Sequence, residues 1–476
     1  LQLADKLVVT TNSSICNLVV NQLAACGIAI KIAASADDVG IKTSAGTRRC
    51  ANSQNKRIKK AKVRSARNGA LAKINPAAHK LGPSGTLPQQ SYGHTVQGAS
   101  TSQVKAMRRN MKLGTSLGNT SSCTTTTLGW FYGPRGDPAV STKLEQISDW
   151  IDTWIAASPS SRARIRTMWK RTLPKLGLHR DTMWQHAEGT ISATSCASFE
   201  IGWKPLTPDK WLAGDNIAII EGAGFNKAHI LGAAQADICK ASWAAAKAHP
   251  NSSGIDEGAF LQPARDVKKS LIKEGNFAAA RALNFIVCGA IYDPVPDAVG
   301  NYANEHICTR CDKRVPASKW HNYWECAGNQ SIEHKHIKAT NKLVVGAKAN
   351  WDTFQCLYAR GIIPDSWLGR PDDIAFLEAK VWESADFSAT LDSTGFACSD
   401  GAASTKDIPK SISQVGFGAV TFDFVPTEAD DFKLNNLACI GGQVPGRQTV
   451  PRAELWGAIQ TLIRASTHVD IDLGID

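Results

Sequence analysis

The chain has 476 residues, of which 43% are hydrophobic and 20% are charged, and its formal net charge is +12. This composition is that of a soluble globular protein, and the length predicts about two to four domains. No apolar run reaches the roughly 18 residues of a transmembrane helix. We expect no signal peptide either, since the first residues lack a charged segment followed by an apolar one.

Cysteine usage indicates the compartment. The 13 cysteines are odd in number and are mostly scattered singly. This pattern argues against a disulfide framework and favours a reducing environment. We therefore expect an intracellular protein, nuclear or cytoplasmic, with no membrane partner.

Basic residues are concentrated in one part of the chain. Between Asp38 and Asp137 the sequence holds 17 Lys or Arg and no Asp or Glu, so this segment carries the whole basic excess. Such a distribution is typical of a surface that follows the phosphate backbone of a nucleic acid.

The first 50 residues predict alternating short strands and one helix. Helical spacing of apolar residues follows Ser13 and Ser14, either of which is a suitable cap. The predicted elements are a strand at 6–10, a helix at 15–26, and strands at 28–32 and 38–41.

This order resembles the segment that follows the active-site aspartate pair of a non-LTR retrotransposon reverse transcriptase. The resemblance implies that Lys6 begins the last palm element and that 38–41 is the primer grip. The alternative, that Asp37 and Asp38 are the polymerase metal pair, is disfavoured. Ala34-Ser35-Ala36 precedes the two aspartates, where the family has an aromatic residue.

A strongly basic helix is predicted at 56–74, with a loose apolar stripe that includes Ile58, Ala61 and Val63. No acidic residue balances its charge, and stacking groups are scarce nearby, so we expect contacts with phosphates rather than base readout. A thumb-like helix with Val104 follows, and the run 114–127 predicts a loop or linker. The predicted nucleic-acid contacts are Lys56, Arg57, Lys59, Lys60, Lys62, Arg64 and Arg67.

Residues 138–300 predict helices to which the sequence assigns no chemistry. Apolar residues from Leu144 to Ile155 recur at spacings of three and four, which predicts a stripe that faces the core. Further amphipathic helices are predicted at 162–172, 228–248 and 264–290, and a possible strand follows the turn at 202–205.

Cysteine and histidine then recur at the spacing of a zinc site. Cys308, Cys311, His321 and Cys326 form a Cys-x2-Cys-x9-His-x4-Cys pattern. Four protein ligands close the tetrahedral shell of Zn²⁺, so the site would be structural. His306, His334 and His336 remain alternatives to His321. The segment resembles the zinc-binding knuckle between the polymerase and ribonuclease H parts of such retroelements.

Three carboxylates mark the C-terminal part of the chain. Asp400 closes a predicted strand, Glu454 lies near the start of a predicted helix, and Asp476 ends a further strand. The helix has an apolar face, Leu455, Ile459, Leu462 and Ile463, that we expect to pack on the strands. This order resembles the first two-thirds of a ribonuclease H domain, in which such carboxylates hold two Mg²⁺ or Mn²⁺ ions and hydrolyse a phosphodiester.

The resemblance implies that Gln448 and Thr449 contact phosphate, whereas Val450 and Pro451 depart from the polar residues of the family. The fourth carboxylate and the closing helices of the family have no counterpart, so we expect a piece of a longer polyprotein.

The predicted fold is multidomain, of mixed α/β and α class. We expect a reverse-transcriptase palm end and basic thumb-like region at 1–127, a helical region at 128–300, a zinc knuckle at 301–340, a helical connector at 341–390 and an incomplete ribonuclease H-like domain at 391–476. The implied activity is cleavage of the RNA strand of an RNA–DNA hybrid. The alternative is a catalytically inactive remnant that binds RNA or DNA.

Overall fold

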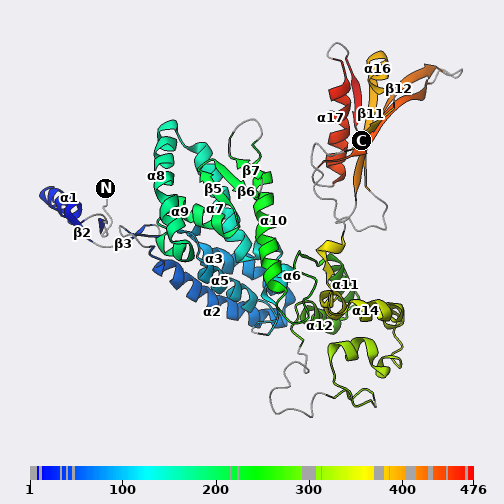
Figure 1. Cartoon of the computed structure of the whole chain (residues 1–476), viewed down its shortest axis with the longest axis horizontal. Helices are drawn as coiled ribbons and strands as arrows, with labels where there is room; N and C mark the ends of the chain where they lie inside the picture. Colours follow the sequence, from blue (N-terminus) through cyan, green and yellow to red (C-terminus); the bar gives the residue numbers. More distant parts are fainter. Residues whose placement is uncertain are drawn as a thin grey trace. The chain divides into compact units, whose positions relative to one another are not determined.

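The computed structural model describes the chain in two compact units, residues 1–364 and 365–476 (Figure 1). Helices and strands are mixed, and within the described residues no helix is both long and apolar enough to cross a membrane. The description leaves out residues 1–7, 10–12, 33–34, 39–40, 45–48, 119, 215, 222–224, 292–306, 312, 369–379, 385, 404–413, 427–431, 446–448, 467–469 and 476.

The first described elements are short. They are β1 (Val8–Val9), α1 (Ser13–Ala25), β2 (Lys31–Ile32), β3 (Ser35–Asp38) and β4 (Ile41–Ser44). The predicted helix is confirmed. The single strand predicted at 38–41 is wrong, because Asp38 ends β3 and pairs with Ile41 at the start of an antiparallel β4. Lys6 lies outside the described residues.

A layer of helices follows, and its first long helix is the basic segment. Ile58 of this helix is buried with Val104 and Met107 of α5. The Asn110 side-chain amide donates to the Ile58 carbonyl over 2.9 Å, so the basic helix is confirmed and fixed along one side. The helices of this layer are α2 (Asn52–Ile74), α3 (Leu87–Ser91), α4 (His94–Gln97), α5 (Thr101–Leu113), α6 (Thr124–Tyr132) and α7 (Pro138–Ala156).

The loose apolar stripe of α2 includes an exposed residue, Val63. One prediction for this layer is wrong in part. The run 114–127 is not a loop to its end, because α6 begins at Thr124 and the side chain of Thr127 is fully buried. The Thr127 hydroxyl donates to the Cys123 carbonyl over 2.7 Å, which satisfies a polar group that a linker would leave in water.

Five tryptophans form the centre of the first unit. Buried indole N–H groups need acceptors, and Trp150 donates to the Pro208 carbonyl over 2.9 Å while Trp203 donates to Asp237 over 2.7 Å. The predicted core stripe of α7 is confirmed for Ile147, Trp150, Ile151 and Trp154, which are at most 1% exposed, and is wrong for Ile155, which is 45% exposed. The five are Trp150, Trp154, Trp169, Trp203 and Trp211. The elements around them are α8 (Pro159–Leu178), α9 (Thr190–Glu200), β5 (Lys204–Thr207), β6 (Lys210–Ala213), β7 (Asn216–Ile219) and α10 (Lys227–Ala246).

The rest of the first unit is mostly helical, with one pair of short strands. The stretch 264–290 is two helices rather than one, because Gly275 adopts a positive φ of 75° between them. The strands β8 and β9 are antiparallel, and they join segments about 100 residues apart in sequence. These elements are β8 (Ala259–Phe260), α11 (Gln262–Lys273), α12 (Phe277–Val287), α13 (Lys335–Thr340), α14 (Val344–Asn350), α15 (Gln355–Arg360) and β9 (Ile363–Pro364).

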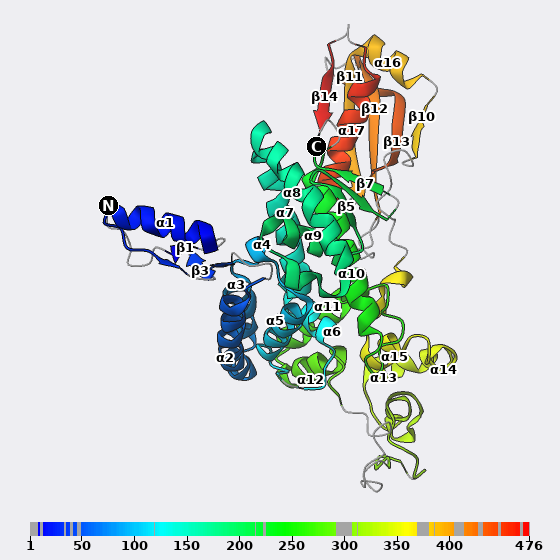
Figure 2. The same ribbon diagram turned by 60° about the vertical axis from the view of Figure 1, so that its left-hand side comes forward.

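The second unit contains a mixed sheet of five described strands in the order β10-β13-β12-β11-β14 (Figure 2). β11 pairs antiparallel with β12 and parallel with β14, and α17 makes the crossover from β13 to β14. The elements are β10 (Val381–Glu383), α16 (Phe387–Thr394), β11 (Phe396–Ala403), β12 (Val415–Pro426), β13 (Phe432–Gln443), α17 (Val450–Arg464) and β14 (Asp472–Ile475).

The face of α17 that packs on the sheet is not the one predicted. Leu455, Leu462 and Ile463 are 55–67% exposed, whereas small residues such as Ala453 and Gly457 are buried. A Cβ added at Gly457 would lie 3.2 Å from the Cβ of Ser399. The helix approaches β11 so closely that only small side chains fit between them, and the large apolar residues are left outside.

Candidate functional site

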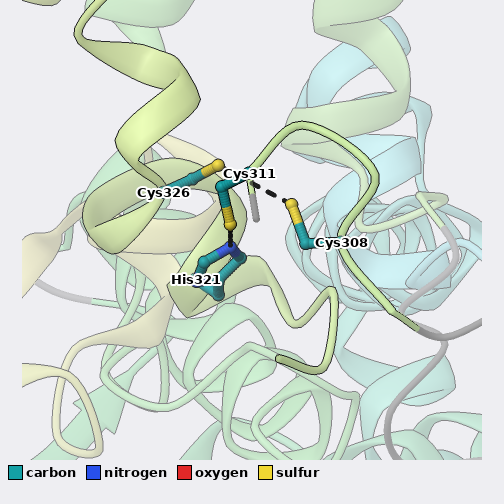
Figure 3. Close-up of side chains that lie close together, drawn as sticks. All are labelled: Cys308, Cys311, His321 and Cys326. Carbon is teal, nitrogen blue, oxygen red and sulfur yellow. Dashed lines mark hydrogen bonds between the residues drawn. The ribbon is translucent and has the colours of Figure 1, made fainter. Parts of the chain in front are cut away.

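The four predicted zinc ligands come together in the first unit. Cys308 and Cys311 lie on a loop, His321 begins a single π-helical turn, His321–Glu325, and Cys326 directly follows that turn (Figure 3). The Cys326 backbone N–H donates to the His321 carbonyl over 2.8 Å. This bond spans five residues, and it puts the second pair of ligands on the same side of the turn.

The distances fit one tetrahedral ion. The four ligand atoms all lie within 4.8 Å of one another. Cys308 Sγ is 3.6 Å from Cys326 Sγ, and Cys311 Sγ is 3.4 Å from His321 Nε2. Zinc–sulfur bonds of about 2.3 Å at tetrahedral angles separate two sulfur ligands by about 3.8 Å. The group could therefore hold a metal ion such as zinc, and its sulfurs are too far apart for a disulfide.

The thiols of this group are not equivalent. The Arg310 backbone N–H donates to Cys308 Sγ over 3.4 Å, and this bond, together with side-chain hydrogen bonds to His321, Cys326 and Cys311, lowers the pKa of the Cys308 thiol to about 6. Burial instead raises the pKa of the Cys326 thiol. Metals bind the thiolate form, and the lowered pKa favours that form at Cys308.

Backbone geometry and aromatic packing hold the ligand loop in place. A Cβ at Gly328 would lie only 2.5 Å from the Arg310 carbonyl oxygen, so a glycine is required there. Trp320 lies edge-on against Trp351 with ring centroids 5.2 Å apart, and the Trp324 indole donates to the Tyr358 carbonyl over 3.1 Å. These contacts attach the π-helical turn to Trp351, which directly follows α14, and to Tyr358 of α15.

Two of the three predicted carboxylates lie on adjoining elements of the second unit. Asp400 is exposed on β11, and Glu454 is half-buried on α17. A Cβ at Gly401 would lie 2.6 Å from the Glu454 backbone nitrogen, so the chain next to Asp400 touches the chain at Glu454. Asp476 and Gln448 lie outside the described residues.

The strand register puts the end of β14 beside the residue that precedes Asp400. Ile475, the last residue of β14, pairs with Ser399, the residue before Asp400. The Asp400 side chain accepts a 2.6 Å hydrogen bond from the Gly401 backbone. It lines an open hollow of about 840 Å³ on the face of the sheet that also carries Cys398 and Gly418. The prediction that three carboxylates share one metal site stays a prediction.

The basic face of α2 is in water. Lys56, Lys59, Lys60, Lys62 and Arg67 are exposed, and among the described residues none of them has an acidic partner. Arg57 and Arg64 are engaged: Arg57 lies over the Tyr92 ring at 4.7 Å, and Arg64 donates to the Gly85 carbonyl over 3.0 Å.

No family model matches the chain, and neither does any curated protein or solved structure.

Among the histidines that the structure describes, His321 is the one that joins the three cysteines, as predicted. His321 completes the group with the three cysteines, whereas His334 is exposed and is not in it. The side chains of His306 and His336 are not described. Thr449, a predicted phosphate contact, precedes α17 as its N-cap residue, and its hydroxyl makes no capping bond to the helix.

Proposed function

We propose that this chain is a retroelement-derived nucleic-acid-binding protein whose second unit is a ribonuclease H-type nuclease. On this proposal it hydrolyses the RNA strand of an RNA–DNA hybrid and leaves 3′-hydroxyl and 5′-phosphate ends. The observation that carries the proposal is the junction of β11 and α17. There a strand bearing Asp-Gly touches a helix at its glutamate, and the next strand runs parallel beside the first.

The order of strands and helix in the second unit also supports the ribonuclease H-type proposal. A ribonuclease H domain begins with three antiparallel strands, crosses through a helix and returns to a strand parallel to the first. β11, β12, β13, α17 and β14 follow that order. A glycine is required at 401, the residue after Asp400, since a Cβ there would meet the Ala453 Cβ at 2.7 Å.

Each residue has a defined role in the proposed reaction. Asp400, Glu454 and Asp476 would hold Mg²⁺ or Mn²⁺, which when bound activates water and stabilises the leaving oxygen. Thr449 and Gln448 would position the phosphate at the start of α17. The 2′-hydroxyl would distinguish the RNA strand from the DNA strand. The Cys308 group would bind structural zinc.

The test is cleavage of a labelled RNA–DNA hybrid by the purified chain with Mg²⁺. Asp400→Asn should lower the rate by more than about 100-fold, since even changes to residues behind metal ligands cost about 10–100-fold. Equal inactivity of the wild type and the variant would refute the nuclease proposal.

The second unit offers a matched control. Asp423 is exposed on β12 and accepts from the next backbone N–H over 2.8 Å, as Asp400 does. Gly418, which pairs with Asp400, precedes Asp423 by five residues, a separation of roughly 17 Å along the strand. Asp423→Asn should leave the rate unchanged, and a matching loss there would assign the effect to the fold.

The second candidate is a catalytically inactive protein that binds RNA or DNA. The exposed and unpaired lysines of α2 favour it, because they need no catalytic site to bind phosphates. Replacing Lys59, Lys60 and Lys62 by Glu should flatten the salt dependence of hybrid binding. An unchanged slope would remove α2 from the proposed interface.

A further inference from the structure

A second helix of the first unit is as one-sided in charge as α2. Between Asp152 and Asp181 the chain holds seven Lys or Arg and no Asp or Glu. Six of them are on α8, which lies at an edge of the helical layer in both ribbon views (Figures 1 and 2). Its inner side is fixed by Trp169 and Leu176, which are at most 1% exposed.

The six charges of α8 form two sets. One set is engaged within the unit: Arg162 pairs with Glu221 at 2.6 Å, and the Arg162 and Arg166 guanidiniums lie over the Trp154 ring. Arg166 also faces Asp209, and Lys175 pairs with Glu188 at 3.2 Å. These contacts are explained by the fold.

The other set has no partner in the fold. Arg164, Lys170 and Arg171 are exposed, and within the described chain none of the three makes an ion pair or a side-chain hydrogen bond. Arg164 and Arg171 are seven residues apart, which puts them on one side of the helix about 10 Å from each other, and Lys170 directly precedes Arg171. Three unpaired cations on the solvent side of one helix repel one another, and an anionic partner relieves that repulsion.

The segment that follows α8 is hydrogen-bonded to the chain just before α2. Residues Arg180–His186 follow α8 as a 3₁₀ segment, and the Gln185 carbonyl accepts from the Arg49 backbone N–H over 2.9 Å. Between this segment, the start of α2 and the start of α5 lies a polar cleft of about 490 Å³. Its lining includes Asn55, Ser100 and Ser102, with Asp181 and Arg49 as its charged residues.

We propose that the exposed face of α8, formed by Arg164, Lys170 and Arg171, binds the phosphodiester backbone of the nucleic acid that α2 contacts, with the polar cleft between the two contacts. This inference rests on the nucleic-acid binding proposed above and extends it to a helix to which the sequence assigned no chemistry. The contact is with phosphates and is independent of base sequence.

The experiment measures how the affinity for an RNA–DNA hybrid of about 30 base pairs depends on salt. The variant replaces Arg164, Lys170 and Arg171 by Gln in the full chain. Each lost phosphate contact should lower the magnitude of the slope of log K against log salt by about 1, so the variant should lose about 3. Combining it with the α2 variant should flatten the slope further.

A control variant removes the same charge elsewhere. Lys227, Lys240 and Lys247 lie on or directly after α10, and Lys227 and Lys247 are paired with Asp152 and Asp256. Replacing these three by Gln should leave the slope as in the wild type. An equal flattening by both variants would show an effect of net charge and would overturn the α8 assignment.

The remaining outcomes separate the two proposals. If the α2 variant flattens the slope and the α8 variant does not, the α8 inference fails and α2 keeps its role. If the wild-type chain does not bind the hybrid, both fail. Vesicles with anionic lipid are the competing partner: loss of vesicle binding with unchanged hybrid binding in the α8 variant would assign the face to a membrane surface and overturn the inference.

Discussion

The cysteine–histidine group and the carboxylate pair are two sites of the same chain that were predicted in the same way, from residue types at suggestive spacings. All four members of the first lie within 19 consecutive residues, and the fold brings every ligand atom within 4.8 Å of the others. Asp400 and Glu454 of the second are separated by the β12–β13 hairpin. A shared site there would require both the strand register and the close approach of α17 to β11.

The difference shows why a short-range site can be predicted from sequence while a long-range one cannot. A loop and one turn suffice to direct four ligands at one point, and metal binding supplies the free energy that orders them. A site shared between strands requires the whole sheet. Removing the metal ligands should therefore affect the first unit alone, and disrupting the sheet should affect the second unit alone.

The largest expected effect is loss of the metal. Purified protein should contain about one zinc per chain, and Cys308→Ser with Cys311→Ser should remove it. Structural zinc contributes roughly 10–16 kcal/mol of apparent binding free energy, so amides of the ligand loop should lose protection from hydrogen exchange. Zinc retained in this double variant would contradict the ligand assignment. Cys26→Ser with Cys398→Ser, at exposed positions, is the control and should keep the metal.

The next effect concerns the contact between β11 and α17. Gly401→Ala would insert a Cβ 2.6 Å from a backbone nitrogen, which forces the helix away from the strand. We expect the unfolding free energy of the second unit to fall by about 1–3 kcal/mol, as in other overpacked sites. Gly418→Ala is the control, because its Cβ would meet nothing closer than 3.9 Å. Denaturant unfolding of the two variants checks the difference, and equal stabilities would refute the close approach.

The smallest effect is expected on the outer face of α17. Leu462→Gln and Ile463→Gln should change the unfolding free energy by no more than about 0.5 kcal/mol, because both side chains are exposed. Leu391→Ala, at a fully buried position in the same unit, should cost about 2–5 kcal/mol. A large loss at Leu462 would restore the original prediction that this face packs on the strands.

Charge shows a related limit of the sequence analysis. Counting acidic and basic residues identified the segment from Asp38 to Asp137, and the same count applied to the interval from Asp152 to Asp181 would have identified α8. The count could not separate Arg162, which is paired within the unit, from Arg164, which is exposed. That distinction depends on which side of the helix faces Trp154.

The sequence by itself determined the basic helix, the tryptophan core stripe of α7, the strand–helix–strand order of the second unit and the four residues of the cysteine–histidine group. Each of these depends on local spacing, which the covalent chain fixes. Tertiary structure decided which face of α17 is buried, how closely α17 approaches β11 at Gly401, and which arginines of α8 are unpaired. Those outcomes depend on the distance between elements that are remote in sequence, and the size of the side chains between them sets that distance.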